Sequence, residues 1–317
     1  MSVRGRAPRD AVAWKDRLRS IIVGRRRYAL LIAGTAVALS SLTACGNKAS
    51  PHAVSGHQQL SKGDQYVAIG DSYTSAPRIG PPTDRIGCLQ TTNNYPHQVS
   101  KRLGLELTDV SCGGATTQQL TRPQLLGNVS QPPQIDALSR TTDLVTISLG
   151  ANDFGIFGGV VFVCPAVRAK DPTGAPCTTA NAAAGKNSVE HRVASLEKRL
   201  VAVIELVKKR APKAQVVVVG YPQFFPAAGP CDQLPLADGD FPLAHKVNKE
   251  LVEVQKTAAA KSKVEYVDVF NATKGHDMCA AEPWMAGLRP GRADAMPYHP
   301  FPQEQRAVTD LLVDLLN

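Results

Sequence analysis

Short apolar runs recur along the chain after residue 64, and they predict the strands of a parallel sheet. β-Branched and other apolar residues are concentrated in each run, which is typical of strands that are buried on both faces. Five runs meet this description, namely Tyr66–Ile69, Leu105–Val110, Leu144–Leu149, Val216–Val219 and Val264–Val269.

Helical periodicity fills the segments between these runs. Apolar residues recur every three or four positions over Tyr95–Leu103, Val189–Arg210 and Leu243–Ala260. A last amphipathic helix closes the chain, with one face formed by Val308, Leu311, Leu312 and Leu315. Strands that alternate with helices indicate an α/β fold with helices on both sides of the sheet. We therefore predict one domain over residues 64–317, a three-layer α/β/α sandwich around a five-stranded parallel sheet.

Two segments interrupt this alternation. Phe154–Ala183 and Gln223–Pro242 are rich in Gly, Pro and Cys, and they lack the periodicity of core elements. We expect irregular loops here, held by disulfides and framing a cleft. In open parallel sheets the chemistry collects at the carboxyl ends of the strands, and the cleft is expected at that edge.

The first 44 residues predict an export signal. Nine Lys and Arg side chains precede the uncharged stretch Tyr28–Ala44, which is too short for a comfortable transmembrane helix. The stretch ends in Leu-Thr-Ala before Cys45, an order that resembles the lipobox of bacterial lipoproteins. We predict a signal peptide over residues 1–44 and a lipidated, flexible tether over residues 45–63. A plain membrane anchor and a buried Cys45 are the alternatives, and Arg25–Arg27 leaves both Sec and twin-arginine export open.

The net charge does not indicate a nucleic-acid partner. The formal charge of the chain is +9, and residues 1–44 contribute seven of these charges. The remaining +2 is scattered over the domain without aromatic platforms, which argues against binding to nucleic acid. The chain has no Cys-x-x-Cys motif and no His/Cys cluster that would suggest zinc, so we predict no metal and no cofactor.

The seven cysteines divide into one lipidation site and an even set. With Cys45 acylated, six remain in an oxidising compartment, which favours three disulfides. Six cysteines allow fifteen pairings. Pairing neighbours in order closes short loops, and it predicts Cys88–Cys112, Cys164–Cys177 and Cys231–Cys279.

Small-residue turns carry candidate chemistry at the ends of three predicted strands. Gly70–Ser72 presents a hydroxyl just beyond the first strand, where a nucleophile is plausible. Cys112–Ala115 and Gly150–Asp153 follow the next two strands, and they offer a glycine N–H and an Asn amide as uncharged donors to an oxyanion. Tyr298–Pro300 places an imidazole before the last helix. No Gly-x-Ser-x-Gly motif occurs, which disfavours an ordinary α/β-hydrolase.

In this order, the four segments closely resemble the motifs of the SGNH/GDSL hydrolases over residues 65–317. The resemblance implies that Ser72 is the nucleophile and that His299 is the general base. It also implies an oxyanion hole formed by the N–H groups of Ser72 and Gly114 and by the side chain of Asn152. Asn94–His97, Gly275–Cys279 and Trp284 further resemble the actinobacterial secreted branch of this family, which carries three sequential disulfides.

One position departs from the family pattern. The usual acid stands three residues before the histidine, and Met296 occupies that position here. Some members of the branch orient the imidazole with a backbone carbonyl at that position, so the resemblance implies this role for Met296. A carbonyl fixes the tautomer as a carboxylate would, although it stabilises the imidazolium less. Asp294 and the more distant Asp277 are the alternative acids.

The implied activity is hydrolysis of carboxylic (acyl) esters through an acyl-enzyme on Ser72, with a small acyl ester or a lipid as substrate. One alternative is a non-catalytic envelope lipoprotein that binds glycan or lipid on the same scaffold. A second alternative is an acyltransferase or a carbohydrate O-deacetylase. We expect a monomer at the outer face of the cell membrane, attached through the lipid on Cys45, or secreted. Chain-length preference depends on loop shape, which periodicity does not reveal.

Overall fold

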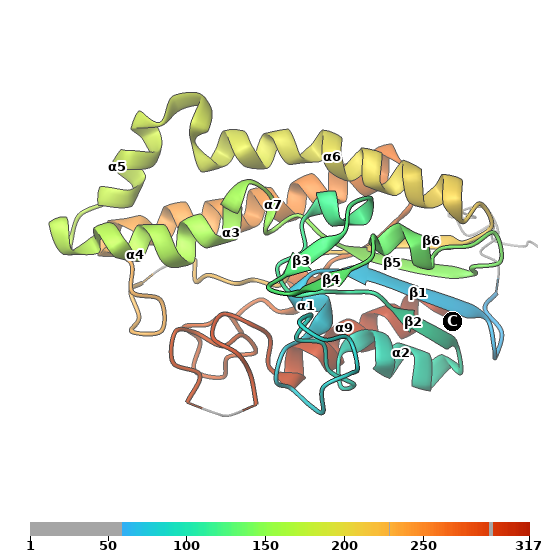
Figure 1. Cartoon of the computed structure of the whole chain (residues 1–317). Helices are drawn as coiled ribbons and strands as arrows, with labels where there is room; N and C mark the ends of the chain where they lie inside the picture. Colours follow the sequence, from blue (N-terminus) through green and yellow to red (C-terminus); the bar gives the residue numbers. More distant parts are fainter. Residues whose placement is uncertain (1–58, 228, 292–293) are drawn as a thin grey trace, which may run out of the picture. The chain divides into compact units, whose positions relative to one another are not determined.

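The computed structural model describes residues 59–227, 229–291 and 294–317. A parallel sheet of five strands, in the order β2-β1-β5-β6-β7, forms the middle layer of the domain (Figure 1). The strands are β1 (Gln65–Gly70), β2 (Glu106–Asp109), β5 (Leu144–Ser148), β6 (Gln215–Val219) and β7 (Glu265–Val267). The structure confirms all five predicted strands to within two residues at each end.

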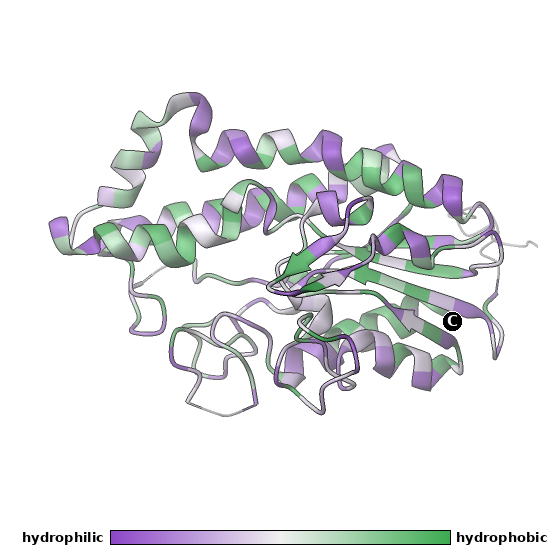
Figure 2. Cartoon of the chain, in the orientation of Figure 1, coloured by the Kyte–Doolittle hydropathy of each residue, from purple (hydrophilic) through white to green (hydrophobic). Residues whose placement is uncertain are grey.

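Four long helices cover the two faces of the sheet (Figure 1). They are α6 (Val189–Arg210) and α7 (Phe241–Lys261) on one face, and α2 (Tyr95–Leu103) and α9 (Pro302–Leu316) on the other. Alternation along β1 explains the two apolar layers, because Val67 and Ile69 pack toward α6 and α7 while Tyr66 and Ala68 pack toward α2 and α9. Figure 2 shows the pattern, with apolar strands between helices that carry one apolar and one polar face. The predicted three-layer α/β/α fold is confirmed.

Shorter elements follow the strands. Helix α1 (Ser72–Ser75) comes directly after β1, and α8 (Val269–Ala272) comes after β7. Strands β3 (Gln124–Leu126) and β4 (Val129–Gln131) form an antiparallel hairpin apart from the main sheet. Single 3₁₀ turns lie at Thr117–Leu120, Gln134–Ala137 and Gly185–Asn187.

The segment after β5 is helical, and the prediction of an irregular loop over Phe154–Ala183 was wrong. It contains a 3₁₀ turn (Asp153–Gly155), α3 (Ile156–Gly158), a π-helix (Gly159–Val163), α4 (Cys164–Val167), a second 3₁₀ turn (Arg168–Lys170) and α5 (Pro176–Ala183). Pro176 stands in the first turn of α5, where the missing N–H costs nothing and the fixed φ suits a helix. A residue typical of loops here begins a helix.

The second expected loop is irregular over most of its length. Its final residues form a 3₁₀ turn (Asp238–Asp240) and the first turn of α7, which begins at Phe241, two residues before the predicted start. Pro242 lies in that first turn, so the proline again marks a helix start.

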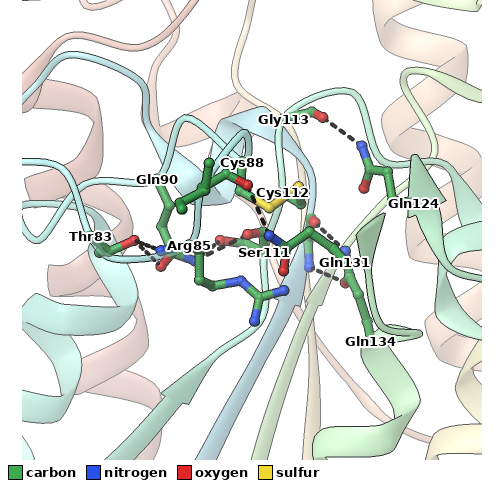
Figure 3. The surroundings of a disulfide bond; sticks show 12 residues. Thr83, Arg85, Cys88, Gln90, Ser111, Cys112, Gly113, Gln124, Gln131 and Gln134 are labelled. Carbon is green, nitrogen blue, oxygen red and sulfur yellow. Dashed lines mark hydrogen bonds between the residues drawn. A yellow bond between two sulfur atoms is a disulfide. The ribbon is translucent and has the colours of Figure 1, made fainter. Parts of the chain in front are cut away.

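The three predicted disulfides are confirmed. Sulfur–sulfur bonds join Cys88 to Cys112, Cys164 to Cys177 and Cys231 to Cys279. The first of them ties the loop before α2 to the turn after β2 (Figure 3).

The predicted signal peptide, Cys45 and most of the predicted tether lie outside the described residues. Among the helices that the structure does describe, none is both long and apolar enough to cross a membrane.

Candidate active site

A cavity of about 420 Å³ brings together segments that are far apart in the sequence. The predicted nucleophile, oxyanion donors and base line it, namely Ser72, Gly114, Asn152 and His299. They come from the turns after β1, β2 and β5 and from the loop before α9. The volume lies within the roughly 300–1,000 Å³ range of small-molecule sites. The remaining lining residues are Asp71, Tyr73, Leu89, Gly113, Ala151, Phe157, Phe162, Leu288, Met296, Pro297 and Tyr298.

Ser72 is the first residue of α1, at a sharp turn out of β1. The Asp71 side chain accepts the Tyr73 N–H at 2.9 Å and so caps this short helix. Gly70 permits the turn, because a β-carbon at this position would lie 2.1 Å from Oγ1 of Thr74. The Gln134 amide binds both the N–H and the carbonyl of Gly70 at 3.0 Å, which fixes the end of the strand. The Ser72 side chain is held at the cavity wall, with 8% of the residue exposed.

The His299 ring is oriented by a backbone carbonyl, and that carbonyl belongs to Pro297. The Nδ1 atom lies 2.8 Å from Pro297 O. The prediction that the Met296 carbonyl orients the ring was wrong, since Met296 O accepts the backbone N–H of His299 at 3.1 Å instead. Tyr298 has a φ of +63°, and this left-handed residue turns the chain so that the carbonyl two positions before His299 meets the ring.

The surroundings of His299 favour its neutral form. Burial lowers the pKa of the imidazole, and the hydrogen bond to Pro297 raises it to a smaller extent. A carbonyl oxygen only accepts, so Nδ1 carries the proton and Nε2 is left with its lone pair. The ring also stacks on Tyr73, with 5.8 Å between the centroids and 23° between the planes. Tyr73 in turn donates to Tyr298 O at 2.7 Å.

The two aspartates considered as alternatives do not line this cavity. Asp277 accepts the Cys279 N–H at 2.9 Å and lies 3.5 Å from Nε2 of Gln223, beside a separate cavity of about 780 Å³. Burial raises the pKa of the Asp277 carboxyl. Asp294 lies in the loop two residues before Met296.

Two turns present candidate donors at the cavity. Gly114 has a φ of +75°, in the left-handed region that glycine tolerates. The Asn152 amide nitrogen lies 3.0 Å from Ala115 O and 3.4 Å from Oδ2 of Asp71. Asn152 is therefore bound to the turn after β2 and also to the turn after β1.

Asp71 and Tyr221 connect these turns through buried hydrogen bonds, and neither was a predicted site residue. Tyr221 Oη donates to Asp71 Oδ2 at 2.5 Å and accepts the Ala151 N–H at 3.1 Å. Both side chains are completely buried, and burial raises the pKa of Asp71 to about 7. Tyr221 stands two residues after β6, and its place at the end of a fourth strand is the only signal that pointed to it.

A family model described as GDSL-like lipase/acylhydrolase matches residues 68–306, which include all four of these turns and loops. The chain belongs to this GDSL-like lipase/acylhydrolase family. Its sequence is 34% identical to Lipase 2 of Streptomyces coelicolor over 260 residues, which cover 79% of this chain and 85% of that protein.

Two solved structures show the same fold as this member of the GDSL-like family. Phospholipase A1 from Streptomyces albidoflavus NA297 is 27% identical with a TM-score of 0.64, over 80% of this chain and 99% of the other. An extracellular lipase from Streptomyces rimosus is 25% identical with a TM-score of 0.65, over 79% and 99% of the two chains. These relatives support ester hydrolysis in general for this GDSL-like chain.

The cavity of this GDSL-like protein has apolar walls that reach the molecular surface. Phe162, Leu89 and Leu288 line it and are 66%, 53% and 37% exposed. Phe162 belongs to the π-helix, and its ring meets Tyr298 edge-on at 5.8 Å. Within the described residues, no group of three or more His, Cys, Asp and Glu side chains is arranged to hold a metal ion.

Proposed function

We propose that this protein is a serine hydrolase that cleaves carboxylic esters through an acyl-enzyme on Ser72. The single observation that carries the proposal is that Ser72, Gly114, Asn152 and His299, from four separate segments, line one cavity. A hydroxyl, a neutral imidazole and uncharged donors are the groups that acyl transfer needs.

The proposed reaction has two half-reactions. Ser72 Oγ attacks the ester carbonyl carbon while Nε2 of His299 takes the hydroxyl proton, and the C–O bond to the alcohol then breaks as His299 returns that proton to the leaving oxygen. Water next attacks the acyl-enzyme with the same base, releasing the acid and the free serine. The Pro297 carbonyl keeps the proton on Nδ1 and Nε2 free, but unlike a carboxylate it adds no full charge to stabilise the imidazolium.

The proposed oxyanion hole consists of the Ser72 N–H, the Gly114 N–H and the Asn152 amide. The Asn152 amide has two protons, and its contact with Ala115 O at 3.0 Å uses one of them. Its contact with Asp71 is longer, at 3.4 Å, so the second proton is the one available to a developing oxyanion.

Labelling with a fluorophosphonate probe tests this proposal, because the reagent phosphonylates an activated serine. We expect labelling of the wild type and hydrolysis of 4-nitrophenyl esters, with both lost in Ser72→Ala. Ser75→Ala is the matched control, since Ser75 lies in the same helix, is buried, and its hydroxyl has no hydrogen-bond partner among the described residues. An unlabelled, folded wild type would indicate a protein that only binds its ligand.

We further propose export through the N-terminal signal and acylation of Cys45, which would hold the enzyme at the outer face of the membrane. The order of basic, apolar and small residues before Cys45 supports this. A substrate in or near the membrane, such as a lipid ester, would then lie within reach of the tethered domain.

A further inference from the structure

The peptide group between Gly113 and Gly114 is free to rotate unless something holds it. Neither of its two neighbours has a β-carbon, so rotation meets little steric resistance. Rotation would turn the Gly114 N–H, a proposed oxyanion donor, away from the cavity. A donor contributes to catalysis mainly when it is already oriented before the charge develops. The orientation of this peptide group therefore bears directly on the rate of the proposed reaction.

The side chain of Gln124 fixes this orientation. Its Nε2 donates to Gly113 O at 2.7 Å (Figure 3). The carbonyl and the N–H of one trans peptide group point in opposite directions. Binding Gly113 O on the side of Gln124 thus holds the Gly114 N–H on the opposite side. A hydrogen bond to the carbonyl also polarises the peptide group and makes its N–H a stronger donor.

The backbone at Gln124 is held by the β3–β4 hairpin. Gln124 is buried, and its backbone pairs with that of Gln131 across the hairpin. Gln131 donates to Ile86 O at 2.8 Å, which ties the hairpin to the loop that carries Cys88 (Figure 3). Cys88 O accepts the Gly113 N–H at 2.8 Å. The hairpin, the loop and the turn with Gly113 therefore form one closed network.

We propose that Gln124 is a positioning residue for the oxyanion hole. Among the described residues it is not one of those that line the cavity, so it acts on the reaction only through the Gly113–Gly114 peptide group. The inference rests on the proposed function, because the orientation of the Gly114 N–H affects the rate only if an oxyanion forms beside it.

The test replaces Gln124 by Met, which keeps the length of the side chain and removes the donor. We expect kcat for 4-nitrophenyl butyrate to fall about tenfold, less than the ~10²–10³-fold for loss of a direct oxyanion donor, with KM nearly unchanged. Phenylboronic acid forms a tetrahedral anion on an active serine. Its affinity should fall by the same factor as kcat/KM, because both report binding of the oxyanion. Rates are expressed per serine titrated with the fluorophosphonate.

Gln118→Met is the matched control, because it makes the same exchange at an exposed side chain that binds Arg122 and lies outside this network. We expect its kcat and its boronate affinity to stay within about twofold of the wild type, on the argument that it orients no oxyanion donor. Equal losses in the two variants, or a loss in kcat without a loss in boronate affinity, would overturn the proposal.

A second variant tests the proposal if Gln124→Met does not fold. Gln124→Glu has the same size, and its ionised carboxylate cannot donate to Gly113 O. We expect a loss at least as large as in Gln124→Met. If both variants unfold, Gln124 serves folding and the proposal fails. If the wild type shows no Ser72-dependent activity, the proposed function fails instead, so the two failures are distinguishable.

Discussion

A carbonyl and a carboxylate orient a histidine equally well, but they differ in charge. Pro297 O accepts from Nδ1 of His299 and selects the tautomer in which Nε2 is basic. It lacks the full negative charge that stabilises an imidazolium in a Ser-His-Asp triad. The proposed esterase therefore depends on its oxyanion donors more than a triad enzyme does.

Replacing either of the two alternative aspartates should have a small effect. Asp294→Ala and Asp277→Ala should each lose less than about tenfold in kcat/KM, whereas removal of a triad aspartate costs ~10⁴-fold in a serine protease. His299→Ala should fall to near background. Asn152→Ala is the internal reference, with an expected loss of ~10²–10³-fold. Steady-state kinetics on folded variants measure these losses. A greater loss of kcat/KM in Asp294→Ala than in Asn152→Ala would establish a triad.

The lowered pKa of His299 predicts the acid limit of the reaction. The imidazole must be neutral to accept the Ser72 proton, so activity is lost as the pH falls through its pKa. Burial lowers that pKa from the ordinary value of 6.5, and the neutral form persists to lower pH. We expect the acid limb of the profile of kcat/KM against pH to have its midpoint below 6.5. A midpoint above 6.5, at a pH where the protein is folded, would contradict this environment.

The residues that could be predicted from the sequence are those that directly follow strands. Ser72, Gly114 and Asn152 share one edge because the carboxyl ends of parallel strands meet there. The sequence could not distinguish Pro297 from Met296, because the direction of each carbonyl depends on the left-handed φ of Tyr298. No residue pattern predicts that φ.

Gln124 could not be predicted from the sequence, and the only signal for Tyr221 was its place after a strand. Their roles arise from contacts with backbone groups that are 11 and 70 residues away in the sequence. A side chain that binds a distant carbonyl or N–H carries no motif of its own, and only the fold brings the partners together.

At the level of elements, the helical insert after β5 forms part of the cavity wall. Its π-helix (Gly159–Val163) exposes Phe162 at the mouth of the cavity, and π-turns are often found at functional sites. The insert was predicted as a loop because its glycines and prolines outweighed a weak periodicity. Proline in the first turn of a helix was the signal that could have corrected the prediction.

Phe162 is expected to contact the acyl chain of longer substrates. Phe162→Ala removes apolar surface, at ~25 cal/mol per Å², that only a long chain would cover. We predict that kcat/KM for 4-nitrophenyl decanoate falls about tenfold, a loss of about 1.4 kcal/mol in transition-state binding, while kcat/KM for the acetate changes little. A series of esters of graded chain length measures the difference.

Leu125→Ala is the control for Phe162→Ala. Leu125 is 77% exposed on the β3–β4 hairpin, and it does not line the cavity. Its removal should leave the chain-length profile unchanged. If Phe162→Ala lowers kcat/KM for the acetate and the decanoate equally, the side chain supports the loop of Tyr298 and does not contact the acyl chain.

At the level of the whole molecule, α9 carries a buried acid that makes stability depend on pH. Glu304 is 2% exposed, and burial raises its pKa from 4.5 to about 8, opposed by a hydrogen bond from Gln305. Between these values the unfolded chain has released the proton and the folded chain still holds it. The unfolded state therefore binds fewer protons, and stability falls as the pH rises from about 4.5 to about 8.

Glu304→Gln tests this dependence, because an amide resembles the protonated acid. We expect the variant to unfold a few degrees above the wild type at pH 8.5 and at the same temperature at pH 4.5. Asp314→Asn removes a carboxylate from the exposed side of the same helix and should show no such crossover. If the difference in unfolding temperature between Glu304→Gln and the wild type is the same at both pH values, the role of Glu304 is refuted.

Acylation of Cys45 would hold the whole protein at the cell surface. Acyl chains contribute about 0.8 kcal/mol per buried methylene, and one chain alone binds a membrane only marginally, whereas two or more anchor firmly. If Cys45 is acylated, the wild type should sediment with membranes after a high-salt wash and should incorporate labelled palmitate. Cys45→Ala removes the acceptor sulfur and should appear in the soluble extracellular fraction, with unchanged kcat/KM on a soluble ester. If Cys45→Ala stays with the membrane, the uncleaved stretch Tyr28–Ala44 is the anchor and the lipoprotein proposal fails.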